Sequence, residues 1–324
     1  MLLIYVFHDR EKLCIIQDVK PNALLIYLRV LRVNQWIKNF VVFTAIIFSG
    51  QLFNINLFSS SLGAFLIFCL LSSTSYVLND VIDYAYDRKH AVKKNRPIAS
   101  GQVSIPQATF IVFVLTIVSL LLSLTFSISF FLLALFFILL HFFYSLYLKK
   151  FPVIDIFTIS FSFMIRAFAG EVVTGYHIPI WLLLTIFFIS LFMAAIKRQA
   201  ELTSHGREAR VSLVRYQPHF LDFLTYTFAT ATMIAYATYT YVEKIPQAKT
   251  IFTERFNNLV PEFEARKWMM ITIPLVVYGL SRYAQLLYEK AEGERPEKII
   301  TTDIPLIVTI FLWGIIVISL IYVF

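Results

Sequence analysis

The amino-acid sequence predicts an all-α integral membrane protein, and three observations support this fold class. Of its 324 residues, 59% are hydrophobic and only 15% are charged, whereas soluble domains carry about 25% charged residues. Apolar runs of about 20 residues, long enough to cross a bilayer as helices, recur along the whole chain. No shift in composition marks a separate soluble domain. We therefore expect a cytoplasmic N-terminal segment at 1–27 and a single transmembrane domain at 28–324.

The apolar runs predict about nine transmembrane helices. Their expected ranges are 28–49, 60–80, 106–125, 128–148, 153–174, 179–197, 219–241, 268–288 and 304–323. The first range is the weakest, because Arg29, Arg32, Gln35 and Lys38 occupy its first half. Charged side chains are costly in hydrocarbon, so we expect this part to lie at the interface or to line a cavity.

The distribution of basic residues predicts the orientation of the chain. If the N-terminus is cytoplasmic, most of the 28 Lys and Arg residues fall on the cytoplasmic side, as the positive-inside rule requires. This topology also accounts for the net charge of +8 without a nucleic-acid partner, and the sequence shows no nucleic-acid-binding motif. Cys14 and Cys69 lie far apart in sequence and indicate neither a disulfide nor a metal site.

An acidic cluster follows the second apolar run, at the predicted cytoplasmic face. On a helix, Asn79, Asp80, Asp83 and Asp87 would fall within an arc of about 100°. Such carboxylates would repel one another, and a hard cation such as Mg²⁺, bound together with substrate phosphates, would relieve the repulsion. The alternative is a solvated helix end with basic neighbours, among them Lys94 and Arg96.

A basic cluster is expected at the same face, at the end of the sixth apolar run. Lys197, Arg198 and Glu201 lie there, and a Lys–Glu pair four residues apart shares one face of a helix. The alternative is a pair that merely reaches the membrane surface. Acidic side chains that hold Mg²⁺ opposite basic side chains would suit a polyphosphate ligand.

Further polar residues point toward this face or into the bundle. Arg166 lies deep in the fifth run and should find an anion, either a substrate or, as a structural pair, Glu171 or Asp155. Asp155 is a candidate for a hydroxyl or metal contact, or for a helix cap after Pro152. Side chains that extend the same polar group are Gln35, Lys38 and Tyr144, whereas we interpret His141 as a buried polar residue.

The spacing Asn79-Asp80-x-x-Asp83-x-x-x-Asp87, followed by Asn95-Arg96-Pro97-Ile98, resembles the first aspartate-rich motif of the UbiA superfamily of intramembrane prenyltransferases. This resemblance implies a nine-helix bundle with a lateral opening to lipid and a Mg²⁺–diphosphate site at the cytoplasmic face. Most members carry a second aspartate-rich motif after the sixth helix. This chain has Lys197-Arg198-Gln199-Ala200-Glu201-Leu202 there instead.

Weaker motifs resemble the decaprenyl-phosphate phosphoribosyltransferase branch of that superfamily. They are Gln35-Trp36-x-Lys38-Asn39, Ile165-Arg166-Ala167-x-Ala169-Gly170, the run at 197–202, Arg282-Tyr283 and Gly293-Glu294-x-Pro296-Glu297. The resemblance implies transfer of the 5-phosphoribosyl group of phosphoribosyl pyrophosphate to a polyprenyl phosphate. The product would be the precursor of the lipid-linked arabinose donor for cell-wall arabinan, made in a bacterial plasma membrane.

The resemblance also suggests roles for the candidate residues. Asp80, Asp83, Asp87 and Asn79 would hold Mg²⁺ on the pyrophosphate, while the surrounding polar side chains would bind the substrates. These are Gln35, Lys38, Lys94, Arg96, Tyr144, Asp155, Arg166, Lys197, Arg198, Glu201 and Arg282. Two other functions stay open: a prenyltransferase that uses a prenyl diphosphate donor, and a non-enzymatic transporter or scaffold. The oligomeric state is also open, and a homo-oligomer is one option.

Overall fold

The described part of this computed structural model comprises residues 23–90, 92–205, 216–244, 268–290 and 302–323, and it is helical throughout, with no strand in these ranges. Seven helices are long and apolar enough to cross a membrane. They are α3 (Ile55–Ile82), α5 (Ile105–Leu124), α6 (Ile128–Leu146), α7 (Ile154–Thr174), α8 (Ile180–His205), α12 (Ile273–Lys290, preceded by η7, Met270–Thr272) and α14 (Ile304–Tyr322). The predicted all-α membrane fold is confirmed.

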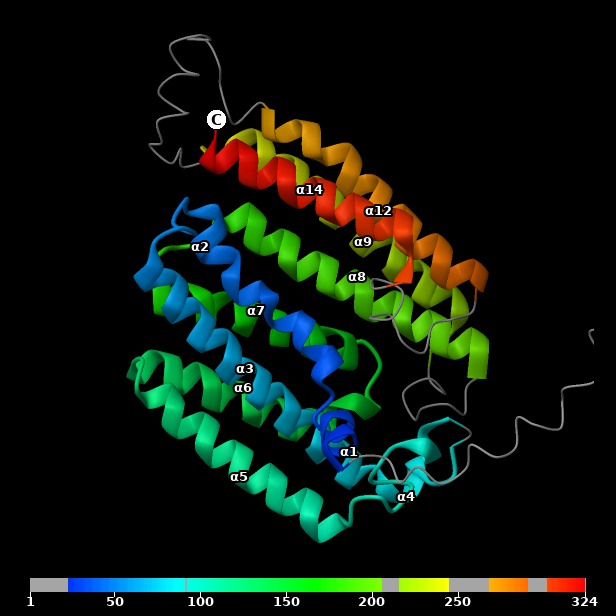
Figure 1. The fold of residues 1–324 in the computed structure, drawn as a ribbon. Helices are drawn as coiled ribbons and strands as arrows, with labels where there is room; N and C mark the ends of the chain where they lie inside the picture. Colours follow the sequence, from blue (N-terminus) through cyan, green and yellow to red (C-terminus); the bar gives the residue numbers. More distant parts are fainter. Residues whose placement is uncertain (1–22, 91, 206–215, 245–267, 291–301, 324) are drawn as a thin grey trace, which may run out of the picture.

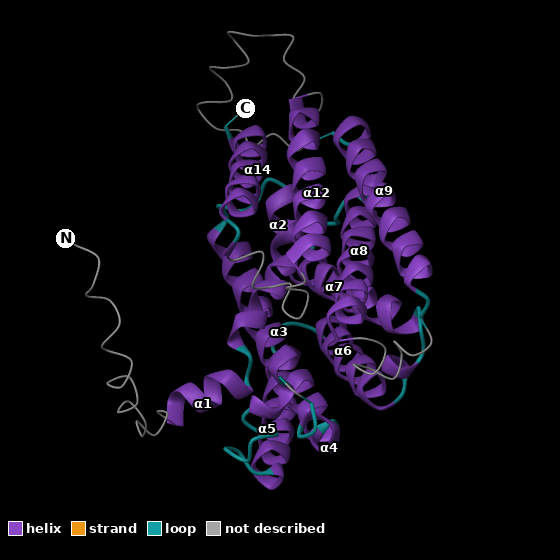
Figure 2. Ribbon diagram, turned by 90° about the vertical axis from the view of Figure 1, so that its right-hand side faces the viewer, coloured by secondary structure: helices purple, strands orange, loops and turns teal. Residues whose placement is uncertain are grey.

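The count of nine spans is not confirmed, because two predicted spans differ from the other seven. The range 219–241 is a long helix, α9 (Pro218–Val242), which is not among the seven apolar ones. The range 28–49 is broken into α1 (Ala23–Val30), the 3₁₀ helix η2 (Val33–Phe43) and α2 (Thr44–Phe48). The break lies at Arg32, whose backbone is left-handed with φ of 51°. As a result, α1 lies across the end of the bundle rather than along it (Figure 2).

The long helices pack side by side in one bundle (Figure 1). In that view α5 and α6 lie on one side, α3, η2, α2 and α7 in the middle, and α8 separates them from α9, α12 and α14. Tyr322, at the end of α14, closes the bundle against α2. Its hydroxyl donates to the Ile47 carbonyl at 2.8 Å and accepts from the Leu52 N–H at 3.0 Å.

Small residues allow the central helices to approach closely, as is usual in membrane bundles. Gly170 of α7 faces the backbone of η2, where an added Cβ would lie 2.1 Å from the carbonyl oxygen of Val42. Two buried hydroxyls on α3 are satisfied within the helix. Ser75 donates to the Leu71 carbonyl at 2.9 Å and Thr74 to the Leu70 carbonyl at 3.0 Å.

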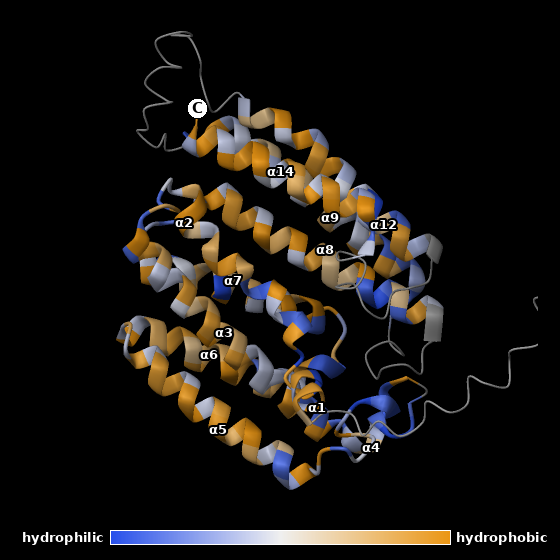
Figure 3. Cartoon of the chain, viewed as in Figure 1, coloured by the Kyte–Doolittle hydropathy of each residue, from blue (hydrophilic) through white to orange (hydrophobic). Residues whose placement is uncertain are grey.

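Hydrophilic residues are concentrated at one end of the bundle (Figure 3). This end carries α1, the short helix α4 (Tyr84–Asp87), and the C-terminal ends of α8 and α12. The rest of the bundle is apolar along its length, so the polar end is where charged side chains meet at low cost. The candidate site lies there.

Candidate active site

The acidic cluster forms where α3 ends. Asp83 stops the helix with a ψ of 3°, and its N–H still bonds to the Asn79 carbonyl at 2.9 Å. One more helical turn, α4, then brings Asp87 to a buried position. The helix thus runs almost continuously from Asn79 to Asp87, as the spacing predicted, but with a break at Asp83.

Asp80 and Asp87 converge on one guanidinium. Arg96 Nη1 lies 2.9 Å from Asp80 Oδ1 and 2.6 Å from Asp87 Oδ2, so these two oxygens face the same point. A second arginine, Arg32, contributes Nη2 at 2.5 Å from Asp80 Oδ1 and lies over the Tyr76 ring at 5.1 Å. Burial raises the pKa of Asp87, and the neighbouring Arg96 lowers it in part.

Asn79 and Asp83 converge on a different cation. Lys149 Nζ donates to Asp83 Oδ1 at 2.6 Å and to Asn79 Oδ1 at 3.1 Å. Lys149 belongs to the 3₁₀ turn η4 (Leu148–Lys150) between α6 and α7, and its side chain is largely buried. The predicted four-residue cluster is therefore divided into two pairs of oxygen donors.

The oxygen donors fit an arrangement in which each pair of side chains would hold a divalent cation, rather than one in which all four side chains hold a single ion. In the described ranges, no three Asp, Glu, His or Cys side chains gather closely enough to share a metal ion. Mg²⁺ is usually bound through one or two carboxylates plus substrate phosphates and water. Asp80 with Asp87, and Asp83 with Asn79, each supply such a pair, and each already faces a positive nitrogen.

Arg198 organises a second cluster at the end of α8. Its guanidinium donates to Asp155 Oδ2 at 2.8 Å, to Glu201 Oε2 at 2.8 Å and to the Tyr144 hydroxyl at 3.3 Å. Arg198 and Asp155 are both fully buried. The structure therefore brings Tyr144, Asp155, Arg198 and Glu201 together, as expected, but Arg198 is engaged by protein groups.

Asp155 is held from a second side by Tyr216. The Tyr216 hydroxyl donates to Asp155 Oδ1 at 2.8 Å and accepts from the Val153 N–H at 2.5 Å. Burial raises the pKa of Tyr216, so the phenol stays protonated and donates. Asp155 does not cap α7, contrary to one expectation: the N-cap is Val153, at φ of 68°, without a side-chain cap.

Arg166 lies within the bundle and contacts neutral groups. Its Nε donates to Asn39 Oδ1 at 2.7 Å, its Nη1 to the Ser162 carbonyl at 2.8 Å, and its Nη2 to Ser72 Oγ at 3.3 Å. It pairs with neither Glu171, which accepts from the Ile178 N–H, nor Asp155. Both structural pairs suggested by the sequence are wrong.

The remaining predicted residues are dispersed around this end of the bundle. Gln35 accepts a long hydrogen bond of 3.5 Å from Tyr76, and Lys38 is half-buried on η2. Lys94 is exposed, and Lys197 is half-buried on α8. Arg282 pairs with Asp303 at 2.9 Å, and Asp303 in turn caps α14, so this contact joins α12 to α14.

Four residues outside the predicted set take part in the site: Arg32, Asn39, Lys149 and Tyr216. Asn39 directly follows the predicted Lys38 in sequence, and Lys149 lies five residues after the predicted Tyr144, so both were close to the predicted set. No pattern in the sequence marked Tyr216 or Arg32. The basic residues at 207–215, the loop at 243–266, the run at 293–297 and most of the N-terminal segment lie outside the described residues.

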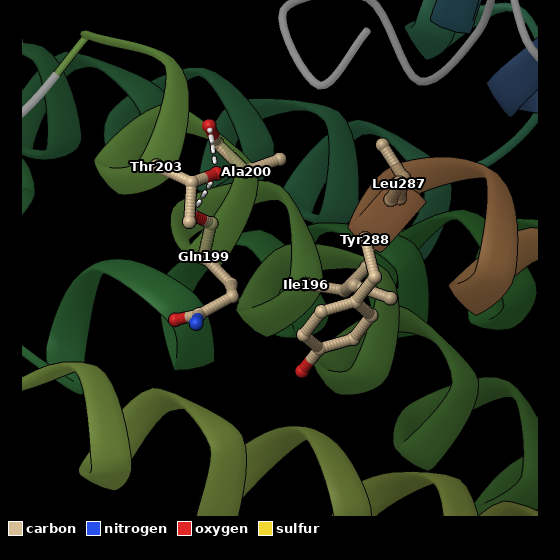
Figure 4. Close-up of a pocket in the computed structure, with 6 residues that line it drawn as sticks. All are labelled: Ile196, Gln199, Ala200, Thr203, Leu287 and Tyr288. Carbon is tan, nitrogen blue, oxygen red and sulfur yellow. Dashed lines mark hydrogen bonds between the residues drawn. The ribbon is translucent and has the colours of Figure 1, made fainter. Parts of the chain in front are cut away.

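A small cavity lies between α8 and α12, near the end of α8 that carries Arg198 (Figure 4). Its volume is about 20 Å³, and it is lined by Ile196, Gln199, Ala200, Thr203, Leu287 and Tyr288. The buried Gln199 Oε1 has no hydrogen-bond partner in the described part of the chain. A cavity of this size holds about one water molecule, so it is not a substrate site.

Comparison with known proteins identifies the family. The model of the UbiA prenyltransferase family matches residues 40–241. The chain belongs to the UbiA prenyltransferase family. It is 31% identical to the decaprenyl-phosphate phosphoribosyltransferase of Corynebacterium glutamicum, over 91% of this chain and 86% of that one. It is also 31% identical to the enzyme of the same name from Mycolicibacterium smegmatis, over 88% and 89% of the two chains.

A solved UbiA structure shares the fold. The UbiA homologue from Archaeoglobus fulgidus, bound to GPP and Mg²⁺, superposes with a TM-score of 0.65 at 20% identity, covering 91% of this chain and 99% of that one. The family and the seven apolar helices together make this a multi-pass membrane protein. A family of transferases also argues against the transporter or scaffold alternative.

Proposed function

We propose that this UbiA-family chain transfers the 5-phosphoribosyl group of phosphoribosyl pyrophosphate to decaprenyl phosphate or a similar polyprenyl phosphate, releasing pyrophosphate. Similarity to two decaprenyl-phosphate phosphoribosyltransferases over nearly the whole chain is the observation that carries the proposal. The product would be the precursor of the lipid-linked arabinose donor for cell-wall arabinan. The proposed location is the plasma membrane, with the N-terminus and the site on the cytoplasmic side, because the basic residues are distributed that way.

The acidic cluster is the proposed site for the pyrophosphate group. Asp80 with Asp87, and Asp83 with Asn79, would hold Mg²⁺, which would act as a Lewis acid toward the leaving pyrophosphate. The cations that these side chains already face, Arg96 and Lys149, lie where they can contact the remaining phosphate oxygens. The structural support is the convergence of both oxygen pairs on positive nitrogens.

The chemistry requires little from the protein beyond charge and position. The bond between the anomeric carbon and the pyrophosphate oxygen breaks, and an oxygen of the polyprenyl phosphate bonds to that carbon from the opposite face, with inversion. The acceptor phosphate is already anionic near neutral pH, so no general base is required. Catalysis then depends on holding the two substrates in line and on stabilising the leaving group.

The second cluster is proposed to orient the ribose. Arg198 is engaged by Asp155, Glu201 and Tyr144, so a positioning role suits it better than direct phosphate binding. Glu201 is partly exposed, with 21% of its side chain accessible, and it could accept a hydrogen bond from a ribose hydroxyl. Lys197 and Lys94 would supply positive charge at the rim of the site.

Pyrophosphate release by the purified protein tests this proposal. The protein, in nanodiscs, is supplied with Mg²⁺, phosphoribosyl pyrophosphate and a polyprenyl phosphate, and each component is omitted in turn. Release that needs all three supports the proposal. Activity only with a prenyl diphosphate and an aromatic or glycerol-phosphate acceptor would instead establish the prenyltransferase alternative.

A further inference from the structure

Two groups of cations among the described residues bear on ligand binding. In the first, each cation contacts at least one carboxylate: Arg32, Arg96, Lys149, Arg198 and Arg282. The second group contains Lys38 and Arg166, and neither forms an ion pair with any residue that the structure describes. Arg166 lies on the apolar helix α7, and Lys38 lies on η2, which packs against α7. An unpaired cation at such a position is costly, so its presence suggests an external anion.

Arg166 is held in place by neutral groups alone. Its side chain is enclosed by Asn39, Ser72 and Ser162, and its guanidinium lies between the rings of Phe137 and Phe163, at 4.8 and 5.2 Å. These contacts fix the orientation of the guanidinium without neutralising its charge. One N–H of Nη2 remains beyond the bond to Ser72.

Two more basic groups lie around Arg166. Lys38 directly precedes Asn39, the residue that accepts from Arg166 Nε. His141 packs its ring 4.4 Å from Phe137, the same ring that contacts Arg166. The His141 Nε2 atom is buried without a partner in the described ranges. Lys38 lies on η2, the element that packs against α7 through the contacts of Asn39 with Arg166 and of Val42 with Gly170.

This basic group is separate from the acidic cluster. Arg166 contacts Ser72, which lies eight residues before Asp80 on the same helix, or roughly 12 Å deeper along the axis. The printed contacts of Arg166 are all to neutral groups, and among the described residues no three Asp, Glu, His or Cys side chains gather to hold a metal ion. An anion bound at this depth would be held by positive charge and hydrogen bonds alone.

We propose that Lys38, His141 and Arg166 form a second anion site that binds a phosphate monoester without metal. The identity of the ligand rests on the proposed function, because both of its substrates carry a phosphate monoester. One source is the 5-phosphate of phosphoribosyl pyrophosphate, and the other is the phosphate of the lipid acceptor. A charge-assisted hydrogen bond from Lys38 contributes roughly 10- to 100-fold to the affinity for such a group.

Binding measurements in the presence of EDTA test the site without the acidic cluster. The full chain in nanodiscs is titrated with ribose 5-phosphate and, separately, with a short-chain polyprenyl phosphate, by calorimetry. Lys38→Met is the main variant, because the Lys38 side chain has no hydrogen bond to the residues that the structure describes, so its loss breaks none of them. His141→Phe is the second variant, and Lys150→Met, an exposed lysine beside Tyr147, is the matched control.

We expect the wild-type chain to bind at least one ligand, and Lys38→Met to bind that ligand at least tenfold more weakly, with Lys150→Met unchanged. Loss confined to ribose 5-phosphate identifies the donor as the source, and loss confined to the polyprenyl phosphate identifies the acceptor. Equal affinity in Lys38→Met and wild type, or no binding by wild type, overturns the proposal. The site and the proposed function can fail separately. If the binding test fails but the protein still releases pyrophosphate with its substrates, the proposed function holds and the site is wrong. If a ligand binds in a Lys38-dependent way but no phosphoribosyl transfer occurs, the site holds and the proposed function is wrong.

Discussion

The buried pair of Asp155 and Arg198 allows a stability prediction to be worked in detail. Asp155→Asn keeps the shape of the side chain but removes the charge that faces Arg198 Nε at 2.8 Å. Breaking a buried ion pair by removing one partner costs about 3–5 kcal/mol. Glu201 remains on the other side of Arg198, so we expect the lower end, about 3 kcal/mol. For a chain of 324 residues, with an unfolding entropy of about 2.1 cal/mol/K per residue, that loss lowers the unfolding midpoint by about 4–5 °C.

The assay is thermal unfolding in nanodiscs, followed by tryptophan fluorescence. Asp222→Asn is the matched control, because Asp222 also accepts from a tyrosine, Tyr288, at 3.0 Å but at an exposed position. This control should stay within about 0.5 kcal/mol of wild type. A midpoint for Asp155→Asn that equals that of the control would refute the assignment of Asp155 and Arg198 as a buried pair.

A double-mutant cycle sharpens the test. Tyr216→Phe removes a hydrogen bond to Asp155 and leaves the Val153 N–H without its acceptor, at a cost of about 1–3 kcal/mol. Because both substitutions act through Asp155, the double variant should lose less stability than the sum of the single variants. Additive losses would show that Tyr216 does not support Asp155.

Three more predictions follow from other parts of the bundle. Gly170→Ala should destabilise the chain by about 1–3 kcal/mol and lower the unfolding midpoint, because the added Cβ would lie 2.1 Å from the Val42 carbonyl oxygen. Gly314→Ala is the control, because an added Cβ there meets open space, and it should leave the unfolding midpoint nearly unchanged. Asp83→Ala should abolish pyrophosphate release and lower that midpoint only modestly, because the partly exposed Asp83 is lost from Lys149 while Asn79 remains; normal turnover would remove Asp83 from the proposed metal ligands. Burial raises the pKa of Asp87 in the folded chain above its ordinary value of 3.8. The folded chain therefore holds the Asp87 proton to higher pH than the unfolded chain does. The stability that this proton contributes is greatest below pH 3.8 and is lost as the pH rises through the folded pKa. Unfolding midpoints of Asp87→Asn and wild type should therefore diverge as the pH rises above 3.8, and parallel curves would contradict the raised pKa.

The sequence predicted most helices because their signal is simple. Apolar runs predicted the positions of α3, α5, α6, α7, α12 and α14 to within five residues, whereas α8 extends to His205, eight residues beyond its predicted end. The same rule failed for 28–49, where Arg32 and its polar neighbours break the helix into three pieces. Charged residues in the first half of an apolar run indicate that the run is not a simple spanning helix. The sequence does not predict where the backbone bends, because that depends on which residues the charged side chains contact.

The site was predicted in composition but not in pairing. The spacing from Asn79 to Asp87 indicated shared contacts on one face, and Asp80 and Asp87 do converge on Arg96. The pairing of Asp83 with Lys149 depends on how the turn after α6 meets the end of α3, which no local pattern encodes. Asp155 was likewise assigned from its position near Pro152, although its partners come from α8 and from Tyr216, 61 residues away.

Product analysis with labelled donor tests the central claim most directly. The purified chain is incubated with Mg²⁺, polyprenyl phosphate and phosphoribosyl pyrophosphate labelled in the ribose, and the lipid is extracted. The account predicts label in the organic phase, in a product that contains both the ribose 5-phosphate and the intact polyprenyl phosphate. Extracts without label, while label from a prenyl diphosphate does reach another acceptor, would contradict it.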